Sequence, residues 1–370
     1  MNKTAFLVAL AGAALPALAT AFTPGNLVVV RLGDGSAFTT GQAAATFLDE
    51  YTTTGTLVQS IAMPTTPSGS GNRALTVGNS ATSEGFLTRS ADGLYLTLGG
   101  YNAAPGTASV STSTSATVNR VLGRVDATGA YDTSTAFADA FSAASIRSVV
   151  SDNGTNFWAT GGNGGVRYTT LGGTTTTQLT SVTGTTNTRV ANIYSGQLYM
   201  STGSSPFIGV SSVGTGLPTS ATTASLLPGF PGATTGSSNY DFYFSNASTL
   251  YVADDSSPNR GLQKWELQSG TWVKTMTFSA GLDASFGLYS ITGTTDGSGN
   301  TVIFASGYSS GTSASKIYAI TDTGAASTFT TVITNANNTR LRGVEFAPIP
   351  TPGSLALLGM GGLVAARRRR

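Results

Sequence analysis

The feature that most restricts the fold of this chain is a pair of short strands joined by a glycine turn, which recurs along the sequence. In each copy, alternating apolar and polar residues stop at a two-residue turn ending in glycine and resume directly after it. Clear copies centre on the turns Asp92-Gly93, Asn153-Gly154 and Ser195-Gly196. Such alternation on both sides of a glycine turn is typical of an antiparallel hairpin. The sequence therefore predicts an all-β protein built from hairpins.

The hairpins recur at a regular interval. First strands are expected at 85–90, 146–150, 189–194, 240–244, 288–293 and 341–346. Their starts lie about 40 to 60 residues apart, an interval typical of a β-propeller blade. Several copies continue into a third and a fourth strand, as at 121–126 and 131–137, which completes a four-stranded antiparallel blade.

The N-terminal copy lacks a first strand and begins with the strand expected at 27–32. The last strand, at 341–346, has no partners after it and supplies the missing one if it pairs with 27–32. That pairing closes the ring, removes open sheet edges and predicts six blades. Two alternatives stay open: a pair of β-sandwiches or an irregular solenoid, and a seventh blade within the threonine-rich stretch 203–231.

Composition excludes several kinds of chemistry. The chain has no histidine and no cysteine, which excludes thiol redox chemistry, Ser-His nucleophiles and histidine-ligated zinc. An exported chain of this composition must be stable without disulfides. Between the two predicted processing segments it has 14 basic and 17 acidic residues, so no nucleic-acid partner is expected.

The N-terminus has the pattern of a secretory signal. Lys3 precedes an apolar run at 5–15, and Ala19-Thr20-Ala21 forms a small-residue cleavage site. This pattern predicts a signal peptide over 1–21, cut after Ala21. The folded body is then expected over 22–349.

The C-terminus, 350–370, forms a second processing segment. An uncharged stretch at 353–366 predicts a hydrophobic helix of roughly 20 Å, which is short against a hydrocarbon core of roughly 30 Å. The arginines behind it are expected to stay in the cytoplasm and to leave the body outside the inner membrane. The residues of the expected sorting motif are Pro350, Thr351, Pro352, Gly353, Arg367, Arg368, Arg369 and Arg370.

This tail resembles the PEP-CTERM sorting signal, with Thr351 in place of the glutamate of the namesake motif. In that family the signal is recognised by a membrane protease-transpeptidase called exosortase. The resemblance implies a Gram-negative host, an exosortase-like processing partner and a cell-surface, biofilm or exopolysaccharide setting. It covers 349–370 alone and implies nothing about the body. Whether the tail is cut or kept stays open.

Candidate ligand-binding residues in the body are few. Asp254 and Asp255, followed by a polar loop, are the expected ligands if the body binds calcium, and a solvated turn is the alternative. No catalytic residue is assigned, and no other cofactor is expected. Some aromatic side chains could stack on sugars, although packing between blades is the favoured interpretation: Trp158, Trp265, Trp272, Tyr101, Tyr240 and Tyr243.

Two function classes follow. The first is a non-enzymatic surface or matrix protein whose propeller binds surface polysaccharide or other surface proteins. The second is a secreted carbohydrate-active or lactonase-like hydrolase that uses carboxylates, with or without calcium. The first is favoured, because the predicted first strands contain few acids; the charged residues noted on them are Arg147, Arg189, Asp241 and Arg342.

Overall fold

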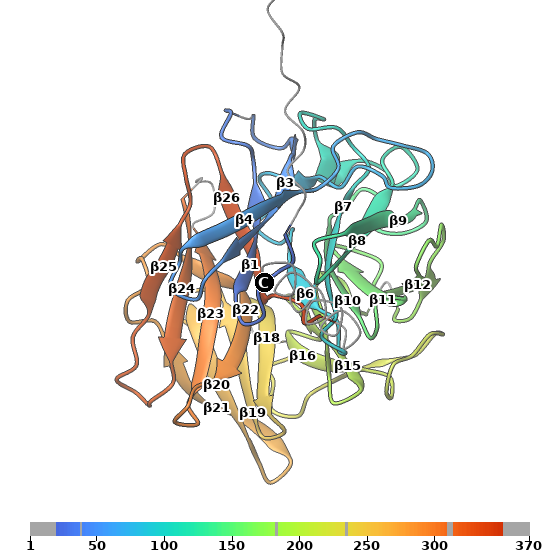
Figure 1. Ribbon diagram of the computed structural model, residues 1–370. Helices are drawn as coiled ribbons and strands as arrows, with labels where there is room; N and C mark the ends of the chain where they lie inside the picture. Colours follow the sequence, from blue (N-terminus) through green and yellow to red (C-terminus); the bar gives the residue numbers. More distant parts are fainter. Residues whose placement is uncertain (1–19, 38, 182–183, 234–235, 309–313, 351–370) are drawn as a thin grey trace, which may run out of the picture.

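The structure is a computed structural model that describes residues 20–37, 39–181, 184–233, 236–308 and 314–350. Six four-stranded antiparallel sheets stand around a common axis (Figure 1). A two-stranded sheet of β2 (Ala43–Ala44) and β5 (Val77–Gly78) and a 3-10 turn η1 (Val110–Thr112) complete the regular elements of these residues. The prediction of an all-β, six-bladed propeller is confirmed.

The first blade orders its strands from the axis outward as β26 (Arg340–Phe346), β1 (Leu27–Leu32), β3 (Thr46–Tyr51) and β4 (Leu57–Ala62). The second consists of β6 (Leu87–Arg89), β7 (Tyr95–Tyr101), β8 (Arg120–Asp126) and β9 (Tyr131–Phe137). The third consists of β10 (Ile146–Ser151), β11 (Asn156–Gly161), β12 (Arg167–Thr170) and β13 (Thr177–Gln178).

The fourth blade consists of β14 (Thr188–Tyr194), β15 (Gln197–Thr202), β16 (Gly209–Val213) and β17 (Ala224–Leu226). The fifth consists of β18 (Asn239–Asn246), β19 (Thr249–Asp254), β20 (Gly261–Gln268) and β21 (Thr271–Phe278). The sixth consists of β22 (Gly287–Thr295), β23 (Thr301–Tyr308), β24 (Ser315–Thr321) and β25 (Thr330–Thr334).

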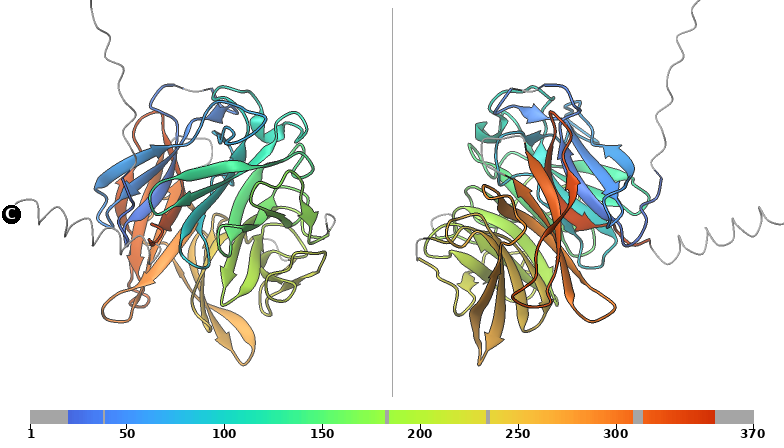
Figure 2. Two further views of the ribbon diagram at one scale, coloured as in Figure 1. Left: turned by 45° about the vertical axis from the view of Figure 1, so that its right-hand side comes forward. Right: turned by 90° about the vertical axis from the view of Figure 1, so that its left-hand side faces the viewer.

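The ring closes by pairing the two ends of the chain, as predicted. Strand β26 lies antiparallel to β1, with Leu27 opposite Phe346 and Val29 opposite Val344. The N-terminal strands and the C-terminal strand therefore share one sheet, which Figure 2 shows from two sides. This pairing occupies the backbone N–H and C=O groups that the inner edge of β1 would otherwise expose at the axis.

The threonine-rich stretch does not form a seventh blade. It contributes β16 and β17, the outer strands of the fourth blade. The sequence pattern did not reveal them, since short outer strands rich in serine and threonine lack clear apolar alternation. The alternatives of seven blades and of packed sandwiches are thereby excluded.

The core lies between neighbouring blades and is rich in aromatic rings. Trp158, Trp265 and Trp272 are 1%, 6% and 6% exposed, and Tyr101 and Tyr240 are 0% and 5% exposed. The interpretation of these rings as packing between blades is therefore confirmed. Of the aromatic candidates, Tyr243 alone is partly exposed.

Both ends of the described chain are held by turns of the second blade. The backbone N–H of Phe22 donates to the carbonyl of Ala127 at 2.8 Å, and that of Ile349 donates to the carbonyl of Gly93 at 2.9 Å. These turns follow β8 and β6, and β7 pairs with β8 from Tyr95 opposite Asp126. Both ends therefore leave the body at the same end of the second blade.

The predicted processing segments lie largely outside the described residues. This applies to Ala19 and to 351–370, with the expected C-terminal helix, whereas Ala21 is described and exposed. No helix within the described ranges is long and apolar enough to cross a membrane. The signal peptide, the sorting tail and its membrane helix stay predictions.

Candidate functional site

The innermost strands of five blades contain one extra residue at the same level of the ring. In each of them, the inner strand has one residue more than the paired stretch of the second strand. The unpaired position is at, or directly next to, one of five residues: Arg147, Arg189, Tyr240, Tyr289 and Arg342. Such a bulge redirects neighbouring side chains. It also interrupts the usual alternation, so residues three positions apart turn to the same side of the strand. In these strands that side faces the axis.

The bulges therefore place two sets of side chains at opposite ends of the axis. The first set, called the arginine layer, consists of Arg147, Arg189, Arg342, Tyr240, Tyr289 and, from the segment before β6, Phe86. The second set lies three residues further along five of these strands and consists of Arg89, Asn192, Tyr243, Thr292 and Glu345.

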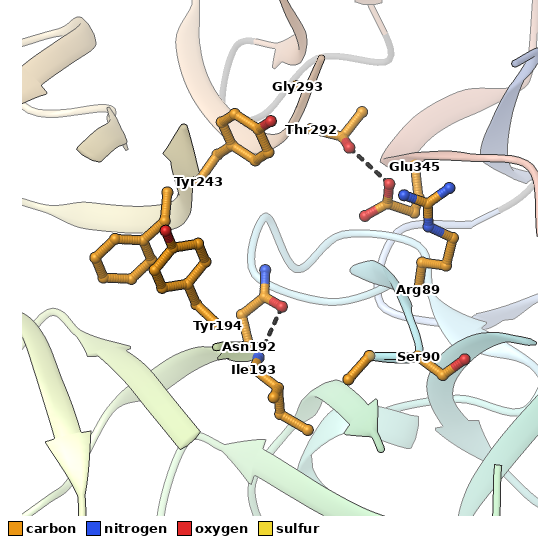
Figure 3. Close-up of a pocket in the computed structure, with 11 residues that line it drawn as sticks. Arg89, Ser90, Asn192, Ile193, Tyr194, Tyr243, Thr292, Gly293 and Glu345 are labelled. Carbon is orange, nitrogen blue, oxygen red and sulfur yellow. Dashed lines mark hydrogen bonds between the residues drawn. The ribbon is translucent and has the colours of Figure 1, made fainter. Parts of the chain in front are cut away.

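The second set lines a cavity of about 220 Å³, called the Glu345 pocket. Figure 3 shows two unlike walls facing each other. One presents the rings of Tyr194 and Tyr243, and the other presents the polar groups of Arg89, Thr292 and Glu345. The pocket thus combines aromatic faces with hydrogen-bonding groups, an arrangement typical of small-molecule sites.

Glu345 is held in place by neighbours on two blades. The hydroxyl of Thr292 donates to its Oε1 at 2.6 Å, and the backbone N–H of Phe346 donates to the same oxygen at 2.7 Å. Burial raises the pKa of the Glu345 carboxyl, while the nearby charge of Arg89 acts in the opposite direction. The carboxyl therefore keeps a proton to a higher pH than an exposed glutamate does.

The tyrosine wall is rigid. The ring of Tyr194 stacks on Phe244 with centroids 4.7 Å apart and planes at 16°. Burial raises the pKa of Tyr243, so its phenol stays protonated at neutral pH and can donate a hydrogen bond. Flat ring faces with a phenolic donor suit a ligand that has both apolar and hydroxylated surfaces, as sugar rings do.

In the arginine layer, aromatic rings meet across the axis. Phe86 of the second blade and Tyr240 of the fifth have ring centroids 6.3 Å apart, and Tyr240 lies 4.6 Å from Tyr289. Arg189 lies over Tyr240 at 3.5 Å, and Arg342 lies over the ring of Tyr308 at 4.4 Å. These contacts pack the axis at this level and fix both guanidinium planes.

Between the two ends lies a buried carboxyl, Asp241, which is 3% exposed. Its Oδ1 accepts the N–H of Phe242 at 2.8 Å, and its Oδ2 accepts the N–H of Ile291 at 2.9 Å and the hydroxyl of Ser290 at 3.2 Å. These bonds join the fifth and sixth blades. Burial raises the pKa of Asp241 from 3.8 to about 7.

This shift predicts a decline of stability with pH. Between about pH 4 and pH 7 the folded protein holds a proton on Asp241 that the unfolded chain has released. The contribution of Asp241 to the free energy of unfolding should therefore be largest below about pH 4, fall across this range and level off above about pH 7. Urea unfolding at several pH values should show a shallower decline for Asp241→Asn.

The exposed carboxyl of Asp139 offers a control for that experiment, since Asp139→Asn should leave the slope unchanged. The slope of the free energy of unfolding against pH reports the titration of Asp241. A loss of stability that the asparagine causes equally at every pH shifts the curve but leaves its slope unchanged. Parallel curves for the protein and Asp241→Asn would contradict the assignment.

The calcium candidates lie at the end of β19: Asp254 is its last residue, and the side chain of Asp255 bonds to Tyr289 of the arginine layer. Asp254 is fully buried, and its oxygens accept bonds from five donor atoms on Ser238, Asn239, Ser256 and Gln263. Asp255 is partly buried in the following loop. Within the described ranges, no three acidic side chains come together as a metal cluster would require. Asp254 thus ties its loop to the neighbouring strands β18 and β20, and calcium binding stays an untested prediction.

Sequence reasoning found part of the two axial sets. It placed Arg147, Arg189 and Arg342 on first strands but expected no cluster at the axis, and it named Tyr243 as a ring that could meet sugars. It missed Glu345 and the other polar residues of the pocket. The sequence does contain one signal for the second set, because each of its members lies three positions after a residue of the arginine layer, as Glu345 does after Arg342. This spacing indicates a shared side of the strand only once the bulges are known.

No protein-family model matches the chain, and no curated protein does either. Among solved structures, the chain is similar to a candidate 6-phosphogluconolactonase from Bacteroides fragilis, with 13% identity over 84% of this chain and 82% of the other and a TM-score of 0.44. It is also similar to AztD from Citrobacter koseri, with 12% identity over 83% and 70% and a TM-score of 0.34. The N-terminal domain of Nup159 gives 10% identity over 82% of each chain and a TM-score of 0.39. These likenesses are distant and concern the fold alone.

Proposed function

We propose that this protein is an exported bacterial surface or matrix protein whose propeller binds saccharides in the Glu345 pocket and leaves them intact. One observation carries the proposal: the tyrosine wall lies opposite the polar wall formed by Arg89, Thr292 and Glu345. Sugars need such a pair of surfaces, because their ring faces stack on aromatic planes while their hydroxyls need donors and acceptors.

The carboxylates support binding rather than hydrolysis. Glycosidases of the common type use two carboxyl groups on either side of the bond that is cut. Glu345 is the one carboxyl among the residues that line the pocket, and the oxygens of Asp241 are already occupied by backbone and serine donors. The hydrolase alternative lacks its second group in this pocket.

The C-terminal end of the described chain leaves the body near the Glu345 pocket, which connects the proposed binding function with the predicted tail. Ile349 bonds to Gly93, two residues beyond Ala91, which lines the pocket. A tail anchored in the membrane would therefore turn the pocket towards the membrane surface. The proposal accordingly includes processing of 350–370 by an exosortase-type enzyme, which frees the pocket for polymer in the surrounding matrix.

The test measures binding of bacterial oligosaccharides to the purified protein and to Tyr243→Leu. A ligand at a hundred times its dissociation constant should stabilise the protein by about 2.7 kcal/mol. Loss of a stacked ring worth about 0.5–1.5 kcal/mol should weaken binding roughly threefold to tenfold. Titration calorimetry gives the affinity, and mass spectrometry shows whether the sugar is intact.

Tyr131→Leu is the matched control, since Tyr131 is also a partly buried tyrosine on a strand but lies away from the pocket. It should leave the affinity unchanged. Shortened oligosaccharides would instead support the hydrolase alternative. The absence of any binding across the panel, or an equal loss in both variants, would overturn the proposal.

A further inference from the structure

Arg147 and Arg189 stand side by side without an acidic partner. They occupy equivalent positions on the neighbouring inner strands β10 and β14, next to the bulges. Neither takes part in an ion pair with any residue in the described ranges. Arg189 is 8% exposed, whereas Arg147 is partly exposed and gives solvent access to the pair.

Both guanidinium groups are fixed yet incompletely bonded. Arg147 Nη1 donates to Asn187 Oδ1 at 2.5 Å and to the carbonyl of Thr188 at 3.1 Å. Arg189 Nη1 donates to the carbonyl of Asn239 at 3.1 Å, and its plane lies on the Tyr240 ring. The Nε atoms of both arginines are buried and have no partner in the protein. Leaving a buried N–H donor without a hydrogen-bond acceptor costs free energy.

The two positive charges also act on each other. Burial and the charge of Arg189 together lower the pKa of Arg147 to about 10, so Arg147 is still charged at neutral pH. A nearby carboxyl, Glu84, does not neutralise them, because burial raises its pKa and its oxygens accept the N–H of Gly78 at 2.9 Å and the hydroxyl of Tyr101 at 3.0 Å. Uncompensated charges of this kind destabilise a fold unless something binds to them.

We propose that Arg147 and Arg189 together bind an oxyanion, the carboxylate or phosphate group of a small ligand, at the end of the axis opposite the Glu345 pocket. Planar guanidinium groups suit such groups, because their paired N–H donors match two oxygens. Neither arginine lines the Glu345 pocket, so this proposal is independent of saccharide binding there.

The chain contains a comparison residue. Arg342 is equally buried, at 4%, stacks on a tyrosine and also has an Nε without a partner, but it lies on the first blade, separated from Arg147 by the second. If stacking alone explains the buried arginines, Arg189 and Arg342 should behave alike. If the pair binds an oxyanion, Arg147 and Arg189 should differ from Arg342.

The experiment titrates the purified full-length protein with inorganic phosphate and with glucuronate, with glucose as the neutral control. Potassium chloride keeps the ionic strength constant throughout. Arg147→Gln and Arg189→Gln should each weaken binding of the effective anion roughly ten- to hundredfold, and Arg342→Gln should not. Binding of phosphate alone assigns a phosphate ligand, and binding of glucuronate alone assigns a carboxylate.

Unfolding without any ligand provides a second measurement. Replacing a purely structural arginine should lower the unfolding midpoint, whereas relieving the repulsion at a vacant anion site should leave it unchanged or raise it. Failure of both anions to bind above the chloride background would overturn the proposal. An equal loss in all three variants, or a lowered midpoint without ligand in Arg147→Gln and Arg189→Gln, would do so as well.

Discussion

Replacing Arg120 by methionine should lower the free energy of unfolding by about 4 kcal/mol or more. Arg120 is fully buried. Its Nη1 donates to Val118 O at 2.7 Å and to Ser113 Oγ at 3.2 Å, and its Nη2 donates to the carbonyls of Ser113, Phe141 and Ala144 at 2.7, 2.7 and 2.9 Å. Methionine fills part of the space but removes all five bonds. The carbonyls of Ser113 and Phe141 keep one backbone donor each, whereas each of the other acceptors loses its Arg120 donor at a cost of about 1–3 kcal/mol.

Arg120 joins the loops at 113–118 and 141–144, which are also connected by a backbone bond from the N–H of Ala143 to the carbonyl of Ser113 at 3.1 Å. The backbone of Phe141 and Ala143 is left-handed, with φ of 52° and 56°, a conformation that side chains disfavour. The guanidinium group fixes the carbonyls at 141 and 144 on either side of this strained turn. The variant should therefore lose order first between the second and third blades.

Urea denaturation measures this effect, with Arg124→Met as the control. Arg124 is on the same strand but partly exposed, with one carbonyl partner at 2.9 Å and a 3.7 Å ion pair to Asp132. Its replacement should cost less than about 1 kcal/mol. Similar unfolding midpoints for the two variants would show that Arg120 does not hold these loops together.

Removing 340–370, and with them strand β26, should abolish cooperative folding. The strand supplies the inner edge of the first blade, and Leu341, Val344 and Phe346 pack with Leu27 and Val29 of β1. Each buried side chain of this size contributes about 1.5–3 kcal/mol. Three such side chains together contribute about 4.5–9 kcal/mol, comparable to the 5–15 kcal/mol by which most domains are stable. The lost backbone pairing with β1 adds to this cost, so no native ring should remain.

A chain that ends at Pro350 is the matched control, because it keeps β26 and lacks 351–370. Circular dichroism during heating should show one sharp transition for this control and none for the shorter chain. Adding a synthetic peptide of residues 340–350 to the shorter chain should restore part of the transition by filling the vacant edge of β1. A sharp transition of the shorter chain on its own would contradict the role of β26 in closing the ring.

The architecture could be predicted from the sequence because each hairpin is formed by residues that are close together in the chain. Turns such as Asp92-Gly93 and Ser195-Gly196 mark each blade, and period-two alternation marks the strands beside them. The pairing of β26 with β1 followed by counting strands, since one copy lacked its first strand. The outer strands β12, β13, β16 and β17 escaped, because two to five residues rich in threonine, serine and glycine give too weak a pattern.

The candidate sites were harder to predict. Asp254 and Asp255 attracted notice as neighbouring carboxylates, yet the oxygens of Asp254 accept bonds from Ser256 in the following loop and from residues on or next to the two neighbouring strands. Glu345 attracted none, although it lies in the pocket. Adjacency in the sequence was a poor guide, since neighbouring residues of a strand point to opposite faces.

By itself, the sequence determined the all-β class, the six blades, their innermost strands and the joining of the chain ends, because each depends on turns and alternation within a few residues. Only the tertiary structure decided which side chains share an end of the axis. That choice depends on an extra residue in the pairing of five of the six innermost strands. It also depends on the contact of strands from different blades, such as β10 with β14 and β26 with β22. A bulge is a property of two paired strands, so neither strand alone reveals where Arg147, Arg189 or Glu345 will point.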